Sequence, residues 1–304
     1  MTKNEIKNNY SKQSKGEFKN AKRGEKPFDK GNAFRGDSRS KRDFKPRENI
    51  EERSADMPVN TEIICGRNPV LEALRSERPI NKVLLAQGQD IIFTRQIKDL
   101  CKVKGVPCQE SYRMRMDKIA AEHRGVIAYV APYAYKTVED MLALAKQRNE
   151  SPLIVILAEV EDPHNLGAVI RTAECVGAHG IIIPKHRAVP MTETVTRVAA
   201  GAAEYVPVAR VANLVHTMKG LKENGIWIAG AQMTDASNLW KSDLKGPLAI
   251  VLGSEGQGIP RLVAENCDFM VELPMKGNIT SLNVSTTAGV ILYEVMRQRD
   301  FAGK

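Results

Sequence analysis

The chain has 304 residues, enough for two domains, and 42% of them are hydrophobic, enough for a buried core. Its formal net charge of +9 favours polyanionic partners. The five cysteines are scattered and include no Cys-x-x-Cys pair, which argues against a disulfide framework or a zinc site and fits a reducing cytoplasm. We expect no membrane contact and no secretory leader, because no stretch approaches ~20 apolar residues and the N-terminus is polar.

Residues 1–58 are expected to form a disordered basic tail. They contain few apolar residues, so they cannot bury enough surface to offset their chain entropy. They hold 16 Lys or Arg against 10 Asp or Glu, and therefore carry +6 of the +9. Two interpretations stay open: an arm that contacts RNA, or a solubilising tail without a specific role. The rest of the chain is only mildly basic.

Residues 59–135 are predicted to form a small α/β domain. The hydrophobic pattern indicates four short strands, at 62–65, 82–86, 106–108 and 126–130. Helices are expected at 66–75, 93–103 and 114–122. Basic residues crowd the last helix and the turn after it, among them Arg113, Arg115 and Arg124. Each one alone is typical of a solvated surface, but as a cluster beside Gly125 they could bind phosphate.

Residues 136–151 are predicted to be a polar linker with a helical pattern, and 152–304 a second domain in which strands and helices alternate. Its strands are expected at 153–157, 180–184, 205–208, 226–230, 248–252 and 269–273. Its helices are expected at 165–176, 192–203, 214–224, 260–266 and 284–299. This alternation predicts a largely parallel sheet covered on both faces, with ligands outside the carboxyl ends of the strands.

Three loops that follow strands of this domain carry the polar residues: 159–167, 253–260 and 273–283. The glycines of the second loop do not follow the dinucleotide order G-x-G-x-x-G and precede no Gly-Lys-Ser/Thr, so a P-loop is excluded. The third loop and the helix start after it hold seven Ser, Thr or Asn residues where one or two would cap a helix. This surplus indicates either a polar binding site or an over-polar cap. We find no Ser-His-Asp set, paired carboxylates or His/Cys cluster, which favours transfer from an activated cosubstrate without a metal.

Three motifs then stand in order: Asn165-Leu-Gly-x-x-x-Arg171, Leu252-Gly-Ser-Glu-Gly-x-Gly258 and Met275-x-Gly-x-x-x-Ser-Leu-Asn-Val284. Together they resemble the motifs of the SpoU/TrmH family of RNA ribose 2′-O-methyltransferases. The amino-acid sequences of residues 162–167 and 201–204 are most similar to the RlmB-type branch, which methylates a guanosine in bacterial 23S rRNA. One departure is 285–287, Ser-Thr-Thr, where relatives more often carry small apolar residues. The long N-terminal tail is a second departure.

The resemblance implies an α/β fold whose C-terminal, mostly parallel sheet contains a trefoil knot (SPOUT type). It also implies that the small domain is a ribosomal-protein-like RNA-binding domain, that the cofactor is S-adenosyl-L-methionine, and that the protein is a cytoplasmic homodimer. The implied cofactor-binding residues are Gly253, Leu273 and Leu282, with Thr234 and Gly230 as weaker candidates. The expected RNA-binding residues are Arg67, Arg113, Arg115 and Arg124.

The implied reaction transfers a methyl group to a ribose 2′-hydroxyl, and the implied catalytic residues are Arg171, Asn165, Glu255, Ser281 and Asn283. A guanidinium is not deprotonated in proteins, so we favour Arg171 as a clamp on an RNA phosphate over Arg171 as a base. We expect large-subunit rRNA as substrate. A tRNA substrate and a non-catalytic role in RNA binding or ribosome assembly remain alternatives, whereas a nucleotide-dependent dehydrogenase fails on the order of the glycines.

Overall fold

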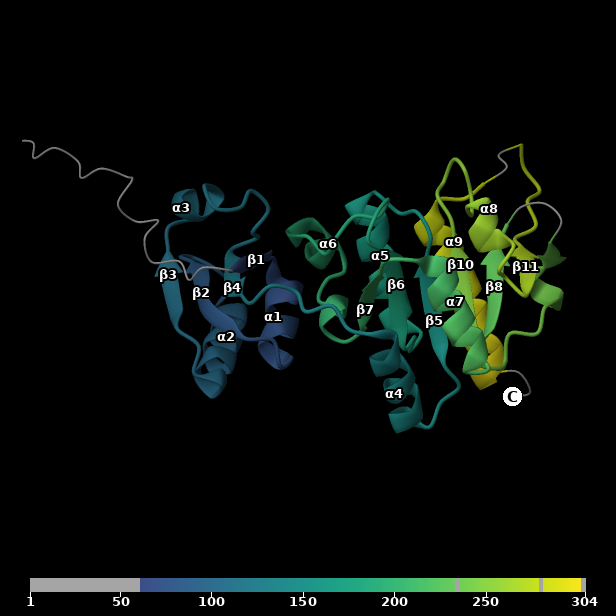
Figure 1. The fold of residues 1–304 in the computed structure, drawn as a ribbon. Helices are drawn as coiled ribbons and strands as arrows, with labels where there is room; N and C mark the ends of the chain where they lie inside the picture. Colours follow the sequence, from purple (N-terminus) through teal and green to yellow (C-terminus); the bar gives the residue numbers. More distant parts are fainter. Residues whose placement is uncertain (1–60, 233–235, 279–280, 302–304) are drawn as a thin grey trace, which may run out of the picture. The chain divides into compact units, whose positions relative to one another are not determined.

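The computed structural model describes residues 61–232, 236–278 and 281–301 of the chain (Figure 1). The predicted tail of residues 1–58 and the candidate Thr234 lie outside the described residues. Within the described ranges, no helix combines the length and the apolar character that a bilayer crossing requires.

The N-terminal part, here called the four-stranded region (residues 61–131), holds a mixed sheet in the order β1-β4-β2-β3. Its strands are β1 Glu62–Cys65, β2 Ile80–Ala86, β3 Cys108–Ser111 and β4 Val126–Val130. Strand β4 is antiparallel to β1 and β2, whereas β3 is parallel to β2. Helices α1 Arg67–Arg75 and α2 Ile91–Lys104 bury Val70, Leu74, Phe93 and Ile97 against one face. Helix α3 Arg113–Asp117 buries Met116 against the other face.

The C-terminal part, here called the seven-stranded region (residues 136–301), holds a sheet in the order β7-β6-β5-β10-β8-β11-β9, and every neighbouring pair in it is parallel. The strands are β5 Leu153–Leu157, β6 Gly180–Pro184, β7 Val208–Val211, β8 Trp227–Ala231, β9 Ser237–Asn238, β10 Leu248–Leu252 and β11 Phe269–Glu272. The expected α/β class and largely parallel sheet are therefore confirmed.

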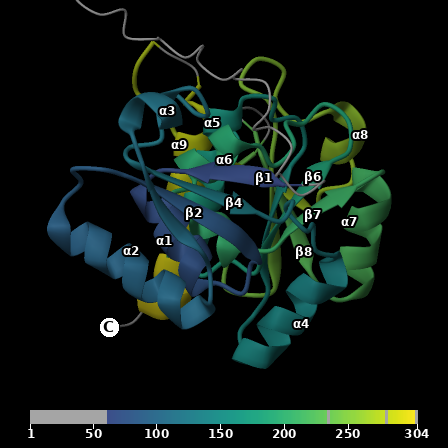
Figure 2. The same cartoon turned by 90° about the vertical axis from the view of Figure 1, so that its left-hand side faces the viewer.

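Helices cover both faces of this sheet because its strands are apolar on both sides. In β5, Leu153, Val155 and Leu157 face one core, while Ile154 and Ile156 face the other. The first core is closed by α5 Pro163–Cys175, α6 Glu193–Val198 and α9 Val284–Met296. The second is closed by α4 Val138–Arg148, α7 Leu214–Glu223 and α8 Arg261–Ala264 (Figure 2). Helix α4 lies in the predicted linker and buries Met141 in this second core.

The helix expected at 192–203 is interrupted. Helix α6 stops at Val198, and the chain turns through Ala200 (φ 54°) and Gly201 (φ 98°) into the short 3-10 helix η2, Ala202–Glu204. A Cβ on Gly201 would lie 2.5 Å from Cγ of Glu72, so glycine is required there for both its φ and its packing. Because η2 uses these residues, β7 begins at Val208 rather than at the expected 205.

The buried His179 is expected to make the free energy of unfolding depend on pH. The buried ring accepts the N–H of Leu153 at Nδ1 (3.0 Å), so the neutral ring carries its proton on Nε2, 3.1 Å from the Glu150 carboxylate. Burial lowers the pKa of His179, although Glu150 opposes this shift. The unfolded chain therefore takes up the second ring proton, which charges the imidazole, more readily than the folded chain does. The neutral buried ring contributes to the free energy of unfolding above about pH 6.5, and this contribution is lost as the pH falls toward the folded-state pKa.

We expect the unfolding free energy, measured by urea titration, to fall more between pH 7.5 and 5.5 in the wild type than in His179→Gln. The variant also loses about 1–2 kcal/mol at pH 7.5, because a buried hydrogen bond is removed. His216→Gln, at an exposed position of α7, is the matched control and should keep the wild-type pH dependence. Identical slopes for wild type and His179→Gln would contradict the assignment.

Candidate active site

The three polar loops meet at one edge of the seven-stranded sheet. They follow β5, β10 and β11, and the strands β5, β10, β8 and β11 are consecutive neighbours in the sheet. Because these strands are parallel, their carboxyl ends share one edge. The fold therefore brings the first loop together with two loops that follow it about a hundred residues later in the sequence.

A cavity of about 440 Å³ opens at this edge, a size typical of small-molecule sites. Five of the predicted site residues line it: Gly253, Glu255, Leu273, Ser281 and Leu282. Its walls combine backbone of the glycine loop with apolar side chains from β11, the third loop and α9. Such a lining suits a ligand with a flat apolar body and a few polar edges.

The glycine loop has a closed, tight shape that fixes Gly253. The N–H of Ser254 donates to the carbonyl of Gly258, and the N–H of Gly258 donates to the carbonyl of Ser254, both at 3.0 Å. A Cβ on Gly253 would lie 2.0 Å from the carbonyl carbon of Gly258. Glycine is therefore needed at position 253 for the loop to close on itself, and the closed loop forms one wall of the cavity.

Gly230 lies outside this wall. It is buried in β8, where a Cβ would lie 2.6 Å from Sδ of Met270, so its small size serves packing between β8 and β11. The next two residues, Ala231 and Gln232, line the cavity instead. We did not predict these two from the sequence, although the strand-end rule could have indicated them once the end of β8 was known.

A side-chain cluster joins the three loops. Glu255 Oε1 accepts hydrogen bonds from Nδ2 of Asn165 (3.0 Å) and Nδ2 of Asn283 (2.5 Å), and Asn283 Nδ2 also lies 2.9 Å from Asn165 Oδ1. The other end of Asn283 caps α9, since its Oδ1 accepts the N–H of Ser285 at 2.9 Å. We call Asn165, Glu255 and Asn283 the amide–carboxylate cluster.

Asn165 is available to this cluster because another residue caps α5. Asp162 is the N-cap and accepts the N–H of His164 at 2.8 Å, with Pro163 in the first helical position. The helix thus begins two residues before the expected 165. Asn165 lies within the first turn and directs its amide to Glu255 rather than to its own backbone.

A second cavity, of about 390 Å³, adjoins the first at the glycine loop. Residues 254–257 line both cavities, so Glu255 belongs to the walls of both. The remaining wall of the second cavity includes Glu159, Glu161, Asp162 and Asn165. Carboxylates accept hydrogen bonds from hydroxyl groups and repel phosphate, so this wall suits the hydroxyls of a sugar.

Arg171 is not part of the amide–carboxylate cluster. It is exposed on α5 and forms no hydrogen bond or ion pair with a described residue. The six residues from Asn165 to Arg171 correspond to about 1.7 helical turns, so the two side chains leave α5 in different directions. Arg171 therefore presents a solvent-facing guanidinium on the helix that carries Asn165.

The four predicted RNA-binding arginines lie in the four-stranded region and are exposed. Arg67 donates to Oε1 of Gln89 (3.1 Å) and stacks 4.7 Å above the centre of the Phe93 ring. Arg113 and Arg115 are in α3, and Arg124 lies in the turn before β4 with a φ of 49°.

Large apolar side chains are exposed near these arginines. Tyr112 and Met114 are 72% and 79% exposed, and Ile91 and Ile92 are 83% and 79% exposed. The N–H of Gln87 donates to the carbonyl of Ser111 (3.1 Å), so the turn before α2 lies beside the start of α3. Guanidinium groups beside an exposed aromatic ring, here Tyr112, are typical of surfaces that contact nucleic acid.

Within the described residues, no group of three or more His, Cys, Asp or Glu side chains is arranged to hold a metal ion. The first cavity has walls of backbone groups and apolar side chains. Glu255 contributes a carboxylate to it, and Asn165 and Asn283 hydrogen-bond that carboxylate. The arrangement can bind an organic cosubstrate in one cavity and a hydroxyl-bearing group in the adjoining one, with Glu255 in the wall of each.

Comparison with protein families gives two matches. Residues 152–293 match the family described as SpoU rRNA Methylase, and residues 63–136 match the family described as RNA 2′-O ribose methyltransferase substrate binding. The chain is 44% identical over 249 residues to "Putative TrmH family tRNA/rRNA methyltransferase YacO" of Bacillus subtilis, covering 82% of this chain and 100% of that relative. It is 42% identical to "Putative TrmH family tRNA/rRNA methyltransferase" of Staphylococcus aureus over 80% of this chain and 98% of that relative.

Solved structures share the fold. The SpoU methyltransferase AviRb from Streptomyces viridochromogenes matches with a TM-score of 0.68 at 24% identity, over 79% of this chain and 90% of that chain. An AdoMet-bound rRNA methyltransferase from Sinorhizobium meliloti matches with a TM-score of 0.66 at 23% identity, over 78% of this chain and 87% of that chain.

Proposed function

Since the chain belongs to the SpoU/TrmH family of RNA methyltransferases, we propose that it transfers a methyl group from S-adenosylmethionine to the 2′-hydroxyl of a ribose, in a guanosine of 23S rRNA. The observation that carries the proposal is the position of Glu255. It lines two cavities that share residues 254–257, and it is held by the amides of Asn165 and Asn283. A methyl transfer needs the ribose oxygen in contact with the methyl carbon and in line with the sulfur, so donor and acceptor sites that adjoin each other suit it.

S-adenosylmethionine suits the first cavity, and its sulfonium supplies a methyl group that is already activated, so no metal is required. Leu273, Leu282 and Ile259 offer apolar contacts for an adenine ring, and the backbone of the glycine loop offers hydrogen bonds for its polar edge. Gly253 acts here through the shape of the loop rather than through a contact of its own. Ser281, which lines the same cavity, has a hydroxyl available to the donor or to the ribose.

The second cavity suits the ribose. Its carboxylates accept hydrogen bonds from ribose hydroxyls, and Glu255 is placed to orient the 2′-hydroxyl or to accept its proton. The amides of Asn165 and Asn283 keep the Glu255 carboxylate in one position before substrate binds. Arg171, exposed on α5, would hold an RNA phosphate and stabilise the developing 2′-oxyanion.

The four-stranded region would form most of a substrate-binding domain of residues 59–135, which 136–151 joins to a methyltransferase domain of 152–304. The exposed Arg67, Arg113, Arg115 and Arg124 support contact with RNA phosphates. We further propose a cytoplasmic homodimer and a knotted C-terminal part. The knot is proposed from membership of the family, and the insertion of β10 between β5 and β8 is compatible with it.

The proposal is tested by mapping ribose 2′-O-methyl groups at nucleotide resolution in total RNA from cells with and without this protein. We expect the loss of one methyl group, at a guanosine of 23S rRNA, and its return when the wild-type gene is supplied but not when Glu255→Ala is supplied. A loss confined to tRNA would replace the substrate by the tRNA alternative. An unchanged methylation pattern would favour the non-catalytic role in RNA binding or ribosome assembly.

A further inference from the structure

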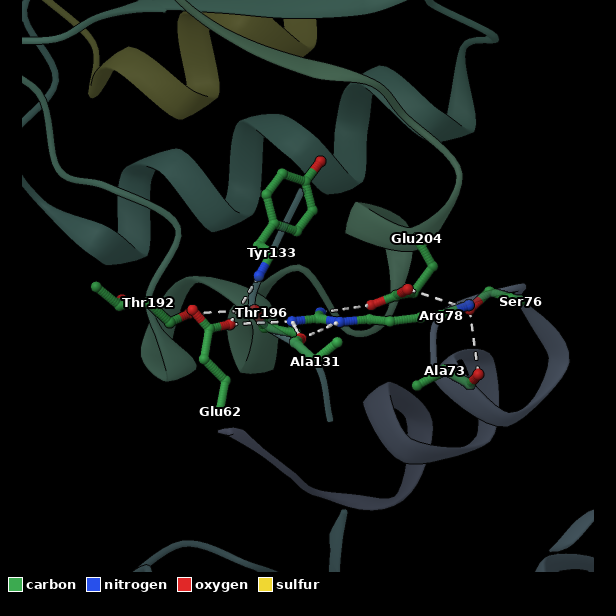
Figure 3. A network of polar contacts seen from close by, with 9 residues as sticks. All are labelled: Glu62, Ala73, Ser76, Arg78, Ala131, Tyr133, Thr192, Thr196 and Glu204. Carbon is green, nitrogen blue, oxygen red and sulfur yellow. Dashed lines mark hydrogen bonds and ion pairs between the residues drawn. The ribbon is translucent and has the colours of Figure 1, made fainter. Parts of the chain in front are cut away.

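A buried arginine connects the four-stranded region to the seven-stranded region. Arg78, whose side chain is 9% exposed, donates to Glu204 Oε1 of η2 at 3.1 Å and to Glu62 Oε2 of β1 at 3.0 Å. Its Nε and Nη2 also donate to the carbonyl of Ala131, at 3.1 and 2.8 Å (Figure 3). The Arg78 guanidinium therefore bonds to β1, to the residue that follows β4, and to η2 of the seven-stranded region.

The Glu204 carboxylate has little access to water, so it depends on protein groups for its hydrogen bonds. Its side chain is 5% exposed, and its second oxygen accepts the hydroxyl of Ser76 at 3.1 Å. Both partners of the Glu204 carboxylate, Arg78 and Ser76, thus come from the four-stranded region. A buried carboxylate is costly unless it is paired, so the two regions are held together wherever Glu204 stays buried.

The residues between the two regions are also fixed. The N–H of Tyr133 donates to Glu62 Oε2 at 3.1 Å, the hydroxyl of Tyr135 accepts the N–H of Met191 at 2.9 Å, and the N–H of Lys136 donates to the carbonyl of Val208 at 2.9 Å. The rings of Tyr133 and Tyr135 pack edge to face, 5.4 Å apart, against the core of the seven-stranded region. The connection between the regions therefore does not act as a free hinge.

Further contacts surround the buried pair. Tyr205 donates its hydroxyl to Glu72 of α1 at 2.5 Å, and Gly201 packs directly on the Glu72 side chain. Arg197 of α6 pairs with Glu122, beside the turn that carries Arg124. The corner of residues 197–205 thus contacts both α1 and the turn before β4, and Gly201 and Glu204 contribute to these contacts.

We propose that Arg78 and Glu204 are positioning residues for the reaction: they lock the RNA-binding surface to the methyltransferase fold, so that RNA bound on that surface presents its target ribose at a fixed place. The inference rests on the proposed function and deepens it, because it concerns how a large RNA is presented. A loose connection would let RNA bind without bringing the ribose to the cavity. A locked connection makes binding on the four-stranded region contribute directly to ribose placement.

The test compares Arg78→Met, Arg78→Lys and Glu204→Gln with the wild type. Arg95→Met is the matched control, because Arg95 is exposed and pairs with Asp99 inside α2, away from the contacts between the regions. Spin labels on Cys175 and on a Val103→Cys substitution, both at exposed positions, report the distance between the regions in a background with Cys108 and Cys267 replaced by Ala. Methyl transfer is measured with an unlabelled, otherwise unmodified chain and a large 23S rRNA fragment.

For Arg78→Met we expect a broadened distance distribution and a KM for the RNA fragment raised about tenfold, with kcat at saturating RNA and the Kd for S-adenosylmethionine within about twofold of wild type. Arg78→Lys keeps the charge but loses the planar set of guanidinium donors, so its KM should lie between those of the wild type and Arg78→Met. If Arg78→Met does not fold, Glu204→Gln decides, since it leaves Arg78 paired with Glu62 and weakens only the bond between the regions.

An unchanged distance distribution together with an unchanged KM in Glu204→Gln and Arg78→Met would overturn the inference. So would a parallel loss of kcat and cofactor affinity, which would indicate a general structural defect. A wild-type protein that methylates no RNA would instead contradict the proposed function. The distance measurement would still test the lock in that case, so the two failures are distinguishable.

Discussion

Replacing Arg171 by Ala is expected to lower the rate of methyl transfer to RNA by about 10²–10³-fold, while the Kd for S-adenosylmethionine changes by less than about twofold. The guanidinium is exposed on α5, makes no bond with a described residue and lies outside the walls of the first cavity. It is therefore free to bind an RNA phosphate, and its loss should remove stabilisation of the transition state without disturbing the cofactor. Single-turnover transfer of a tritiated methyl group and calorimetric titration with the cofactor measure the two quantities separately.

Arg148→Ala is the matched control for this experiment. Arg148 is an exposed arginine at the end of α4, the helix on the opposite face of the sheet from α5, so its removal changes the net charge equally and should leave both quantities unchanged. Arg171→Lys keeps the charge but not the two-pronged donor, and its rate should be intermediate. Turnover of Arg171→Ala close to wild type would remove Arg171 from the catalytic residues and leave the amide–carboxylate cluster and Ser281 as the proposed machinery.

The fold was predictable where the sequence is locally decisive. The unbroken apolar runs at 153–157, 180–184 and 248–252 agree with β5, β6 and β10 residue for residue, because strands buried on both faces need no polar alternation. The predictions were wrong where the chain turns within an apolar pattern. Ala200 and Gly201 end a helix that periodicity alone would continue to 203, and this displacement moves β7 by three residues.

The site was predictable only in part, because the sequence indicates which loops meet but not which side chains pair across the fold. Parallel strands place their carboxyl ends at one edge, so the meeting of Asn165, Glu255 and Asn283 follows from the order of motifs and the sheet class. The pairing of Arg78 with Glu204 spans 126 residues and two sheets, and nothing in the neighbourhood of either residue indicates it. The start of α5 was predicted two residues late, because Asp162 is the N-cap and Pro163 the first helical residue.

Replacing Gly253 by Ala is expected to weaken the binding of S-adenosylmethionine roughly ten- to hundredfold. The new methyl group would meet the backbone of Gly258 at 2.0 Å and of Ile259 at 2.3 Å, and backbone atoms cannot swing aside as a flexible side chain can. The two hydrogen bonds between Ser254 and Gly258 would be lost or distorted, and the loop would leave the wall of the first cavity. Calorimetric titration with the cofactor measures the effect.

Gly246→Ala is the matched control, since Gly246 precedes the same strand β10 and a Cβ there meets no atom within 4 Å. It should keep wild-type cofactor affinity and thermal stability. If Gly253→Ala also binds the cofactor like wild type while remaining folded, then the closed shape of residues 253–258 is not what forms the site. If it loses affinity but transfers methyl groups normally at saturating cofactor, the loop serves binding alone. A fall in both affinity and rate would instead show that the same loop carries Glu255 to its place between Asn165 and Asn283, since moving the loop moves the carboxylate with it.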